Sequence, residues 1–140
     1  KRADQGDSTA QNNLAWMYQK GKGVLKNERK AFEWYRKSAE QGNITAQNNL
    51  AWMYLYGRGV EKNHKKAFIW YSKAAEQDDA TAQHIVGKMY QEGDGTPKDF
   101  LKAFHWYMKA AAQENKLAQY SLASMYCHGN GLTKDLKNIN

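Results

Sequence analysis

The sequence lacks most of the features that would place it in a disulfide-rich or membrane-spanning class. Its only cysteine, Cys127, excludes an intramolecular disulfide framework. It has one proline and no Pro/Gly/Ser-rich linker, which indicates no internal domain boundary. No apolar run approaches the roughly 20 residues that a membrane-spanning helix needs, and no signal peptide opens the chain. We therefore expect no insertion into a membrane.

The residues that catalysis or metal binding would require are also sparse. None of the four histidines, which are His64, His84, His105 and His128, has another at i+3 or i+4. Neither His-Glu-x-x-His nor Cys-x-x-Cys occurs. Cys127 and His128 are adjacent, so on a helix they point in different directions and cannot easily share a metal. The sequence therefore predicts no enzyme, no metal site and no cofactor.

What the sequence does contain is a repeat with a period of 36 residues. Alanine followed by glutamine, methionine followed by tyrosine, and a Gly-x-Gly turn each recur in register. The pairs begin at Ala10, Ala46, Ala82 and Ala118 and at Met17, Met53, Met89 and Met125. Repeats of this length indicate a solenoid, in which each unit buries its apolar face only against its neighbours. We expect the end of a preceding unit at 1–9, repeats at 10–45, 46–81 and 82–117, and a partial repeat at 118–140, in a single array that is part of a longer protein.

Each repeat is predicted to hold two helices, here called helix A and helix B. Apolar residues at i, i+4, i+7 and i+8 from Ala10 define one face of helix A, and Gly21 supplies the left-handed residue that ends it. Helix A begins after Asp7, Asn43, Asp79 and Asn115, and helix B begins after Asn27, Asn63, Asp99 and Asp135, all good N-cap types. Trp34, Trp70 and Trp106 of helix B are predicted to be core residues. The sequence therefore predicts an all-α fold of antiparallel helix pairs.

The motif Ala-Gln-x-x-Leu-Ala-x-Met-Tyr-x-x-Gly-x-Gly-Val, followed by Lys-Ala-Phe-x-Trp-Tyr-x-Lys-Ala-Ala, resembles the Sel-one-like repeat, a relative of the tetratricopeptide repeat. The resemblance covers nearly the whole chain. It implies a right-handed superhelix with helices A on a concave face, and an adaptor that binds proteins. It also favours a bacterial protein that is exported to the periplasm or beyond. Some cysteine-rich members are linked to β-lactam binding, but with Cys127 alone we do not expect that activity here.

The net charge of +7 raises the question of nucleic acid or an anionic surface as partner. Many lysines recur in register with acids nearby, as Lys37 does with Glu40, which is typical of a solvated helix face. No recognition-helix, RRM or OB signature accompanies the charge. We expect no specific nucleic-acid binding, although a basic binder of nucleic acid or anionic surfaces stays an alternative.

The candidate site is a stripe of helix A beside its core stripe. Its tryptophan positions carry lysine or serine in other repeats, so packing does not require an aromatic residue there. Exposed aromatic residues often anchor interfaces. The stripe comprises Asn13, Trp16 and Lys20, then Asn49, Trp52 and Tyr56, then Ile85, Lys88 and Glu92, with Ser121, Ser124 and His128 in the last repeat.

We hypothesise that Trp16 and Trp52 bind a peptide or protein segment. In the alternative interpretation these tryptophans are partly buried against the neighbouring helix A, and the chain is a structural spacer in a longer array. Self-association through uncapped ends of the array is a further possibility.

Overall fold

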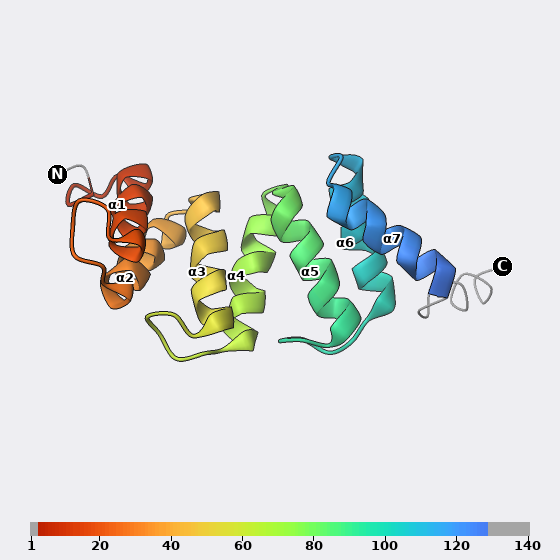
Figure 1. The fold of residues 1–140 in the computed structure, drawn as a ribbon. Coiled ribbons are helices and arrows are strands. Elements are labelled where there is room, and N and C mark those ends of the chain that lie inside the picture. The colour runs from red at the N-terminus through yellow and green to blue at the C-terminus, as the bar shows by residue number, and fades with distance from the viewer. Residues whose placement is uncertain (1–2, 129–140) are drawn as a thin grey trace. The chain divides into compact units, whose positions relative to one another are not determined.

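The computed structural model describes residues 3–128 and forms only helices and turns over that range. Seven helices of 13 residues follow one another (Figure 1). They are α1 (Ser8–Lys20), α2 (Glu28–Glu40), α3 (Ile44–Tyr56), α4 (His64–Glu76), α5 (Ala80–Glu92), α6 (Phe100–Ala112) and α7 (Lys116–His128). The odd-numbered helices are the predicted helices A and the even-numbered ones are helices B. The all-α prediction is confirmed.

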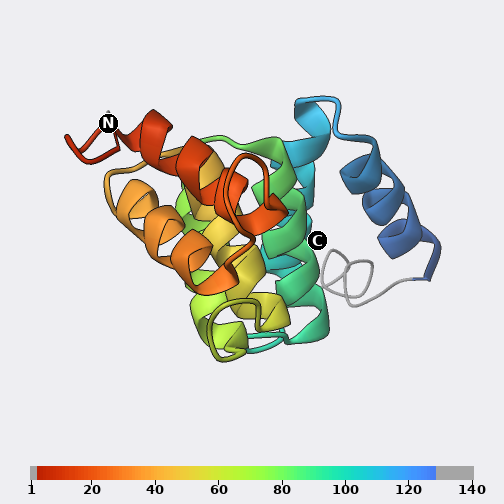
Figure 2. The ribbon, with the colours of Figure 1, turned by 60° about the vertical axis from the view of Figure 1, so that its left-hand side comes forward.

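The helices form two compact units, unit 1 up to Ala74 and unit 2 from Ala75 onward. In unit 1, α2 packs against both α1 and α3, and in unit 2, α6 packs against both α5 and α7. Figure 2 shows α1 and α2 lying side by side in unit 1. Within its unit, α2 and α6 each lie between two helices A, the arrangement of a helical repeat solenoid.

The predicted caps fix where the helices begin. The Asp7 carboxylate accepts the backbone N–H of Ala10 at 3.0 Å, and the Asn27 side chain accepts that of Lys30 at the same distance. Equivalent bonds are formed by Asn43, Asn63, Asp79, Asp99 and Asn115. Each cap satisfies a backbone donor that the first turn leaves unpaired. The remaining predicted cap, Asp135, lies outside the described residues.

The turns from helix A to helix B depend on glycine. Gly21 has φ of 72°, in the left-handed region, and its N–H donates to the Met17 carbonyl at 2.7 Å. A residue with a Cβ is strained there, which explains why glycine recurs at Gly57 and Gly93. The turns from helix B to the next helix A use Gly42 once, but Asp78 and Glu114 adopt the same left-handed conformation at φ of 69° and 65°. Those two turns therefore carry backbone strain that glycine would relieve.

A glutamine bond joins successive repeats. The Gln47 side-chain amide donates to the Ala39 carbonyl, eight residues earlier, at 3.3 Å, and Gln83 donates to Ala75 at 3.2 Å. Gln11 and Gln119 make the same bond to Ala3 and Ala111. This contact, here called the glutamine latch, explains why alanine-glutamine recurs in every repeat. It fastens the start of each helix A to the end of the preceding helix B.

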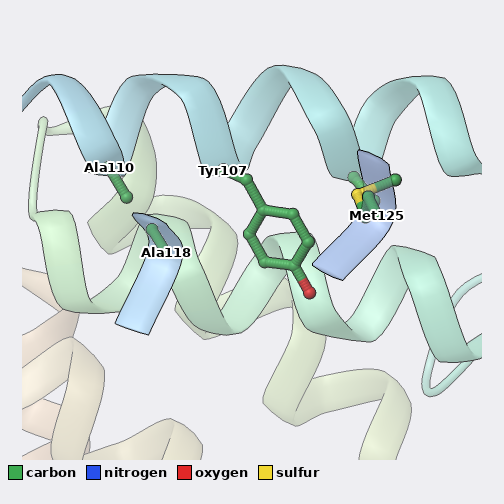
Figure 3. Close-up of a cluster of buried hydrophobic side chains, with 5 residues drawn as sticks. Tyr107, Ala110, Ala118 and Met125 are labelled. Carbon is green, nitrogen blue, oxygen red and sulfur yellow. The ribbon is translucent and has the colours of Figure 1, made fainter. Parts of the chain in front are cut away.

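Buried alanines and a tyrosine from each helix B form the core. In unit 2, Tyr107 and Ala110 point from α6 toward Ala118 and Met125 of α7 (Figure 3), and all four are at most 1% exposed. In unit 1, Leu50 and Tyr35 are fully buried. The small alanines let the helix backbones approach while the tyrosines fill the remaining space.

The tryptophans of helix B lie outside this core. Trp34, Trp70 and Trp106 are half-buried, so the prediction that they are core residues is wrong. The lysine three residues later covers each ring, with the Lys37 ammonium 4.5 Å from the Trp34 ring centre. Lys73 and Lys109 lie over Trp70 and Trp106 in the same way. The tyrosine at the next position takes the core place because it points toward helix A.

Candidate functional site

The helix-A face of unit 1 comprises Asn13, Trp16 and Lys20 of α1 and Asn49, Trp52 and Tyr56 of α3. The spacing i, i+3, i+7 places each trio on one side of its helix. The two helices adjoin, since the Asn49 side-chain amide donates to the Asn12 side-chain oxygen at 3.4 Å. The structure therefore brings these six predicted residues onto neighbouring helices.

The six residues differ in exposure. Asn13, Trp16, Lys20 and Tyr56 are exposed, whereas Asn49 and Trp52 are half-buried. The exposed fraction is 46% for Trp16 and 56% for Tyr56, large values for aromatic side chains. Asn13 also lines a hollow of about 580 Å³ with Leu14 and Met17 of the same helix.

Trp52 is held in place by two neighbours. The Tyr56 ring centre lies 5.3 Å from that of Trp52, and the Arg58 guanidinium lies 5.7 Å from it. Arg58 also forms an ion pair with Glu28 of α2. Trp52 is thus half-buried, whereas Trp16 is 46% exposed. Sequence reasoning missed Arg58, which lies in a turn where the other repeats have Lys22 and Asp94.

Buried tyrosines of the helices B pack behind this face. The Tyr35 hydroxyl donates to the Gln19 side-chain oxygen at 2.6 Å, and burial raises the pKa of Tyr35 to about 12. Burial also raises the pKa of Tyr71, and nearby Tyr56 adds to that shift. Both phenols are therefore neutral at physiological pH, and Tyr35 links α2 to α1 through a hydrogen bond rather than through a charge.

The helix-A face of unit 2 has a different chemistry. Ile85, Lys88 and Glu92 lie on α5, while Ser121, Ser124 and His128 lie on α7. Lys88, Glu92 and His128 are exposed and the other three are half-buried. The Ser121 hydroxyl lies 3.4 Å from His84 Nε2, which links α7 to α5 in the way that Asn49 links α3 to α1.

A polar pocket opens on this second face. It has a volume of about 530 Å³ and a lining that includes Lys88, Glu92 and Ser121. The Tyr107 hydroxyl, also at the pocket, donates to the Gln91 side-chain oxygen at 2.7 Å. Charged and hydroxyl groups thus occupy the places that tryptophan and asparagine occupy in unit 1.

Neither a metal cluster nor a membrane-spanning helix appears between residues 3 and 128. In that range no three His, Cys, Asp or Glu side chains gather as metal ligands would. None of the seven described helices combines the length and the apolar character needed to cross a bilayer.

Comparison with known proteins identifies the repeat. The family model for the Sel1 repeat matches four times, at residues 8–43, 44–79, 80–115 and 116–138. The crystal structure of a Sel1 repeat protein from Oxalobacter formigenes is 42% identical with a TM-score of 0.87, covering 91% of this chain and 52% of that one. No curated protein matches the chain.

Two further solved structures resemble the chain. A protective antigen of uropathogenic Escherichia coli that displays an SLR fold is 38% identical, with a TM-score of 0.88 over 91% of this chain and 27% of that one. Helicobacter pylori cysteine rich protein B, at 24% identity, has a TM-score of 0.69 over 82% of this chain and 89% of its own, and shows the shared fold. The chain spans about half or less of the length of the two more similar relatives.

Proposed function

Since the chain belongs to the Sel1 repeat family, whose members are generally scaffolds for protein–protein interaction, we propose that it binds a protein or peptide segment on the helix-A face of unit 1. Members of this family are typically non-catalytic.

The observation that carries the proposal is the exposure of Trp16. Its side chain is 46% exposed. The equivalent positions in unit 2 hold Lys88 and Ser124. The fold thus accepts a cation or a hydroxyl at this place, and packing gives no reason for an aromatic residue. An exposed tryptophan beside a braced one offers a rigid apolar anchor, the kind of residue that dominates binding energy in interfaces.

The asparagines suit an extended partner. Asn13 is exposed and Asn49 is half-buried, each three residues before a tryptophan. A primary amide both donates and accepts, so it can pair with the N–H and C=O of a peptide backbone. The face therefore combines apolar anchors with groups that hold a main chain in register.

The test uses peptides selected from a displayed random library on the immobilised chain, with affinity measured by fluorescence anisotropy. The double variant Trp16→Ala/Trp52→Ala should weaken binding by more than about tenfold, because it removes both anchors. The matched control is Trp34→Ala/Trp70→Ala, which also removes two tryptophans but from helices B. That control should bind within about threefold of the parent chain.

Two results would contradict the proposal. One is equal loss of affinity in both double variants, which would indicate a general effect of losing tryptophan. The other is a library selection that enriches no peptide, which would favour the spacer interpretation. Circular dichroism of each variant separates loss of binding from loss of fold.

A further inference from the structure

The net positive charge of the chain comes from its first half. Residues 1–74 contain 14 lysines and arginines against six aspartates and glutamates, a net charge of +8. Residues 75–140 contain seven against eight, a net charge of −1. These halves coincide with unit 1 and unit 2. The excess charge is therefore a property of unit 1 rather than of the repeat as such.

Within unit 1 the charge gathers at one end, here called the basic edge and defined as residues 20–30 and 56–66. Each segment runs from the last residue of a helix A, through the turn, into the first turn of helix B. The edge has only two carboxylates, Glu28 and Glu61. Its nine cations are Lys20, Lys22, Lys26, Arg29, Lys30, Arg58, Lys62, Lys65 and Lys66. The corresponding segment of unit 2, residues 92–102, has two lysines and three carboxylates.

The two segments of the basic edge are in contact. A Cβ on Gly59 would lie 2.2 Å from the Glu28 carbonyl oxygen, so the second turn sits directly on the start of α2. The Arg58 guanidinium pairs with the Glu28 carboxylate across the same contact. The edge is therefore one continuous surface, and one of its two carboxylates is already paired.

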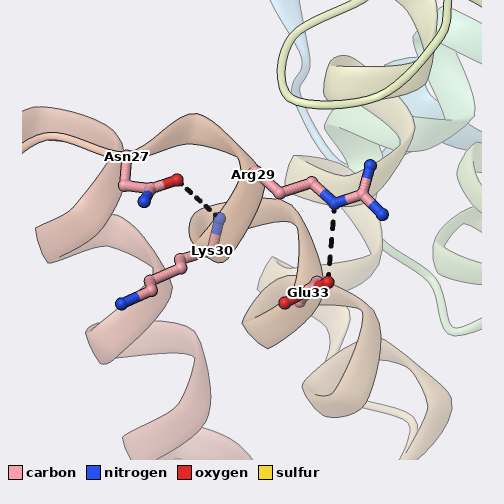
Figure 4. A network of polar contacts seen from close by, with 4 residues as sticks. All are labelled: Asn27, Arg29, Lys30 and Glu33. Carbon is pink, nitrogen blue, oxygen red and sulfur yellow. Dashed lines mark hydrogen bonds and ion pairs between the residues drawn. The ribbon is translucent and has the colours of Figure 1, made fainter.

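Local contacts orient the cations without neutralising most of them. At the start of α2, Arg29 pairs with Glu33 at 3.5 Å while Lys30 extends to the other side of the helix (Figure 4). The Lys30 ammonium lies 5.4 Å from the Tyr18 ring centre, and Lys66 lies 5.6 Å from that of Tyr54. An aromatic face holds a cation in place but leaves its charge intact.

The basic edge adjoins the helix-A face. Lys20 and Tyr56 are the last residues of α1 and α3 and belong to both surfaces, while Arg58 lies over the Trp52 ring. A segment that places an apolar side chain against Trp16 and Trp52 would thus carry its next residues onto the edge. Exposed charges within roughly 8 Å of one another act together at physiological ionic strength.

We propose that the basic edge selects an acidic protein segment, in which glutamates or aspartates adjoin the apolar residues that bind the tryptophans. This inference rests on the proposed function and specifies the chemistry of the partner. Charge complementarity of this kind accelerates association and excludes unsuitable partners.

Two features favour an acidic protein segment over a phosphate polymer. Asp4 and Asp7 lie at the opposite end of α1, where a nucleic-acid strand running along the helices A would meet them. Between the two ends, α3 carries no charged residue at all. A phosphate backbone needs cations along its whole track, whereas a peptide needs them only where its acidic residues fall.

The test compares two labelled peptides, one with a leucine pair flanked by glutamates and one with glutamine in place of each glutamate. The edge variant is Lys22→Gln/Lys26→Gln/Lys62→Gln/Lys65→Gln, which changes four exposed side chains. The control, Lys37→Gln/Lys73→Gln/Lys109→Gln/Lys116→Gln, removes the same number of charges elsewhere. The edge variant should bind the acidic peptide at least about tenfold more weakly, and the control should lose less than about threefold.

Several results would overturn the inference. They are equal losses in both quadruple variants, no preference of the parent chain for the acidic peptide, and tighter binding of an oligothymidylate or of phosphatidylserine vesicles than of that peptide at physiological salt.

Trp16→Ala/Trp52→Ala separates this inference from the proposed function. It should weaken both peptides alike, whereas the edge variant should weaken the acidic peptide alone. If the edge variant binds the acidic peptide as tightly as the parent chain while the tryptophan variant loses affinity, only the acidic preference is refuted. If the tryptophan variant binds normally while the edge variant loses affinity, the proposed binding face is refuted.

Discussion

Unit 1 and unit 2 share the contacts that join and end their helices, but their solvent-facing residues differ. Gln47 and Gln83 make the same latch, and Gly57 and Gly93 end helices A in the same conformation. Yet Trp52 in unit 1 corresponds to Lys88 in unit 2, and the net charge of the A-to-B turn falls from strongly positive to slightly negative. The residues that form the latch and the helix-ending turns are constrained by geometry, while those facing solvent are free to differ. Binding specificity should therefore be sought where the two units disagree.

The largest expected effect tests whether the stability of the shared helical scaffold depends on the residues that recur in each repeat. Leu50 is fully buried in unit 1, and Leu50→Ala should reduce the free energy of unfolding by about 2–5 kcal/mol because it leaves a cavity. Leu25 is 91% exposed, so Leu25→Ala is a control that should change it by at most about 0.5 kcal/mol. Denaturant unfolding measures both, and a loss below about 1 kcal/mol for Leu50→Ala would show that the site is not core.

A smaller effect should follow from opening one glutamine latch. Gln83 is 1% exposed, donates to the Ala75 carbonyl and accepts from the Gln113 side chain at 2.9 Å. Gln83→Leu leaves both partners without this bond and should cost about 1–3 kcal/mol. Gln119→Leu should cost less, because Gln119 is exposed and water can replace it. Equal costs measured by thermal unfolding would mean that burial does not set the strength of the latch.

The smallest expected effect concerns a position where unit 2 departs from unit 1. His84 stands where α1 and α3 have Asn12 and Asn48, and it faces the Tyr107 ring at 5.7 Å, the Ser121 hydroxyl and Lys88. Burial, and then the Lys88 charge, lower the pKa of His84 below its usual 6.5. Its neutral form thus stabilises the fold above about pH 6.5, and this contribution is lost as the pH falls through the lowered pKa.

The thermal midpoint of the parent chain should accordingly fall more than that of His84→Asn between about pH 7 and pH 5. Differential scanning fluorimetry across that interval checks this. Parallel curves for the two proteins would show that His84 does not contribute to acid sensitivity.

The fold could be predicted from the sequence because its signals are local and repeated. Asp7 needs only the N–H of Ala10, three residues away, to begin α1, and Gly21 ends the helix through Met17, four residues back. Neither contact depends on the rest of the chain. The same logic held at each described repeat, so the helix order and the family followed from the residues alone.

Burial within a helix was harder to predict. Trp34 and Tyr35 are neighbours on helix B and either could have faced helix A, yet Tyr35 is fully buried and Trp34 is only half-buried. Lys37, which covers the Trp34 ring, is compatible with either residue facing helix A and so does not distinguish the two arrangements. Arg58 escaped prediction because its contacts with Trp52 and Glu28 depend on how the turn packs against α2. No local pattern encodes that packing.

The glutamine latch has a consequence for how such a chain could change in length. Gln47 reaches Ala39 and Gln83 reaches Ala75, so each bond spans only the boundary between one repeat and the one before it. A 36-residue stretch could be duplicated or deleted in register, and every boundary would still have its donor and its acceptor. A new copy would carry the same caps, turns and latch, so its solvent-facing residues could then vary independently. Growth by copying would leave the pattern seen here, in which two adjacent repeats share a tryptophan, Trp16 and Trp52, and the next repeat has diverged to Lys88.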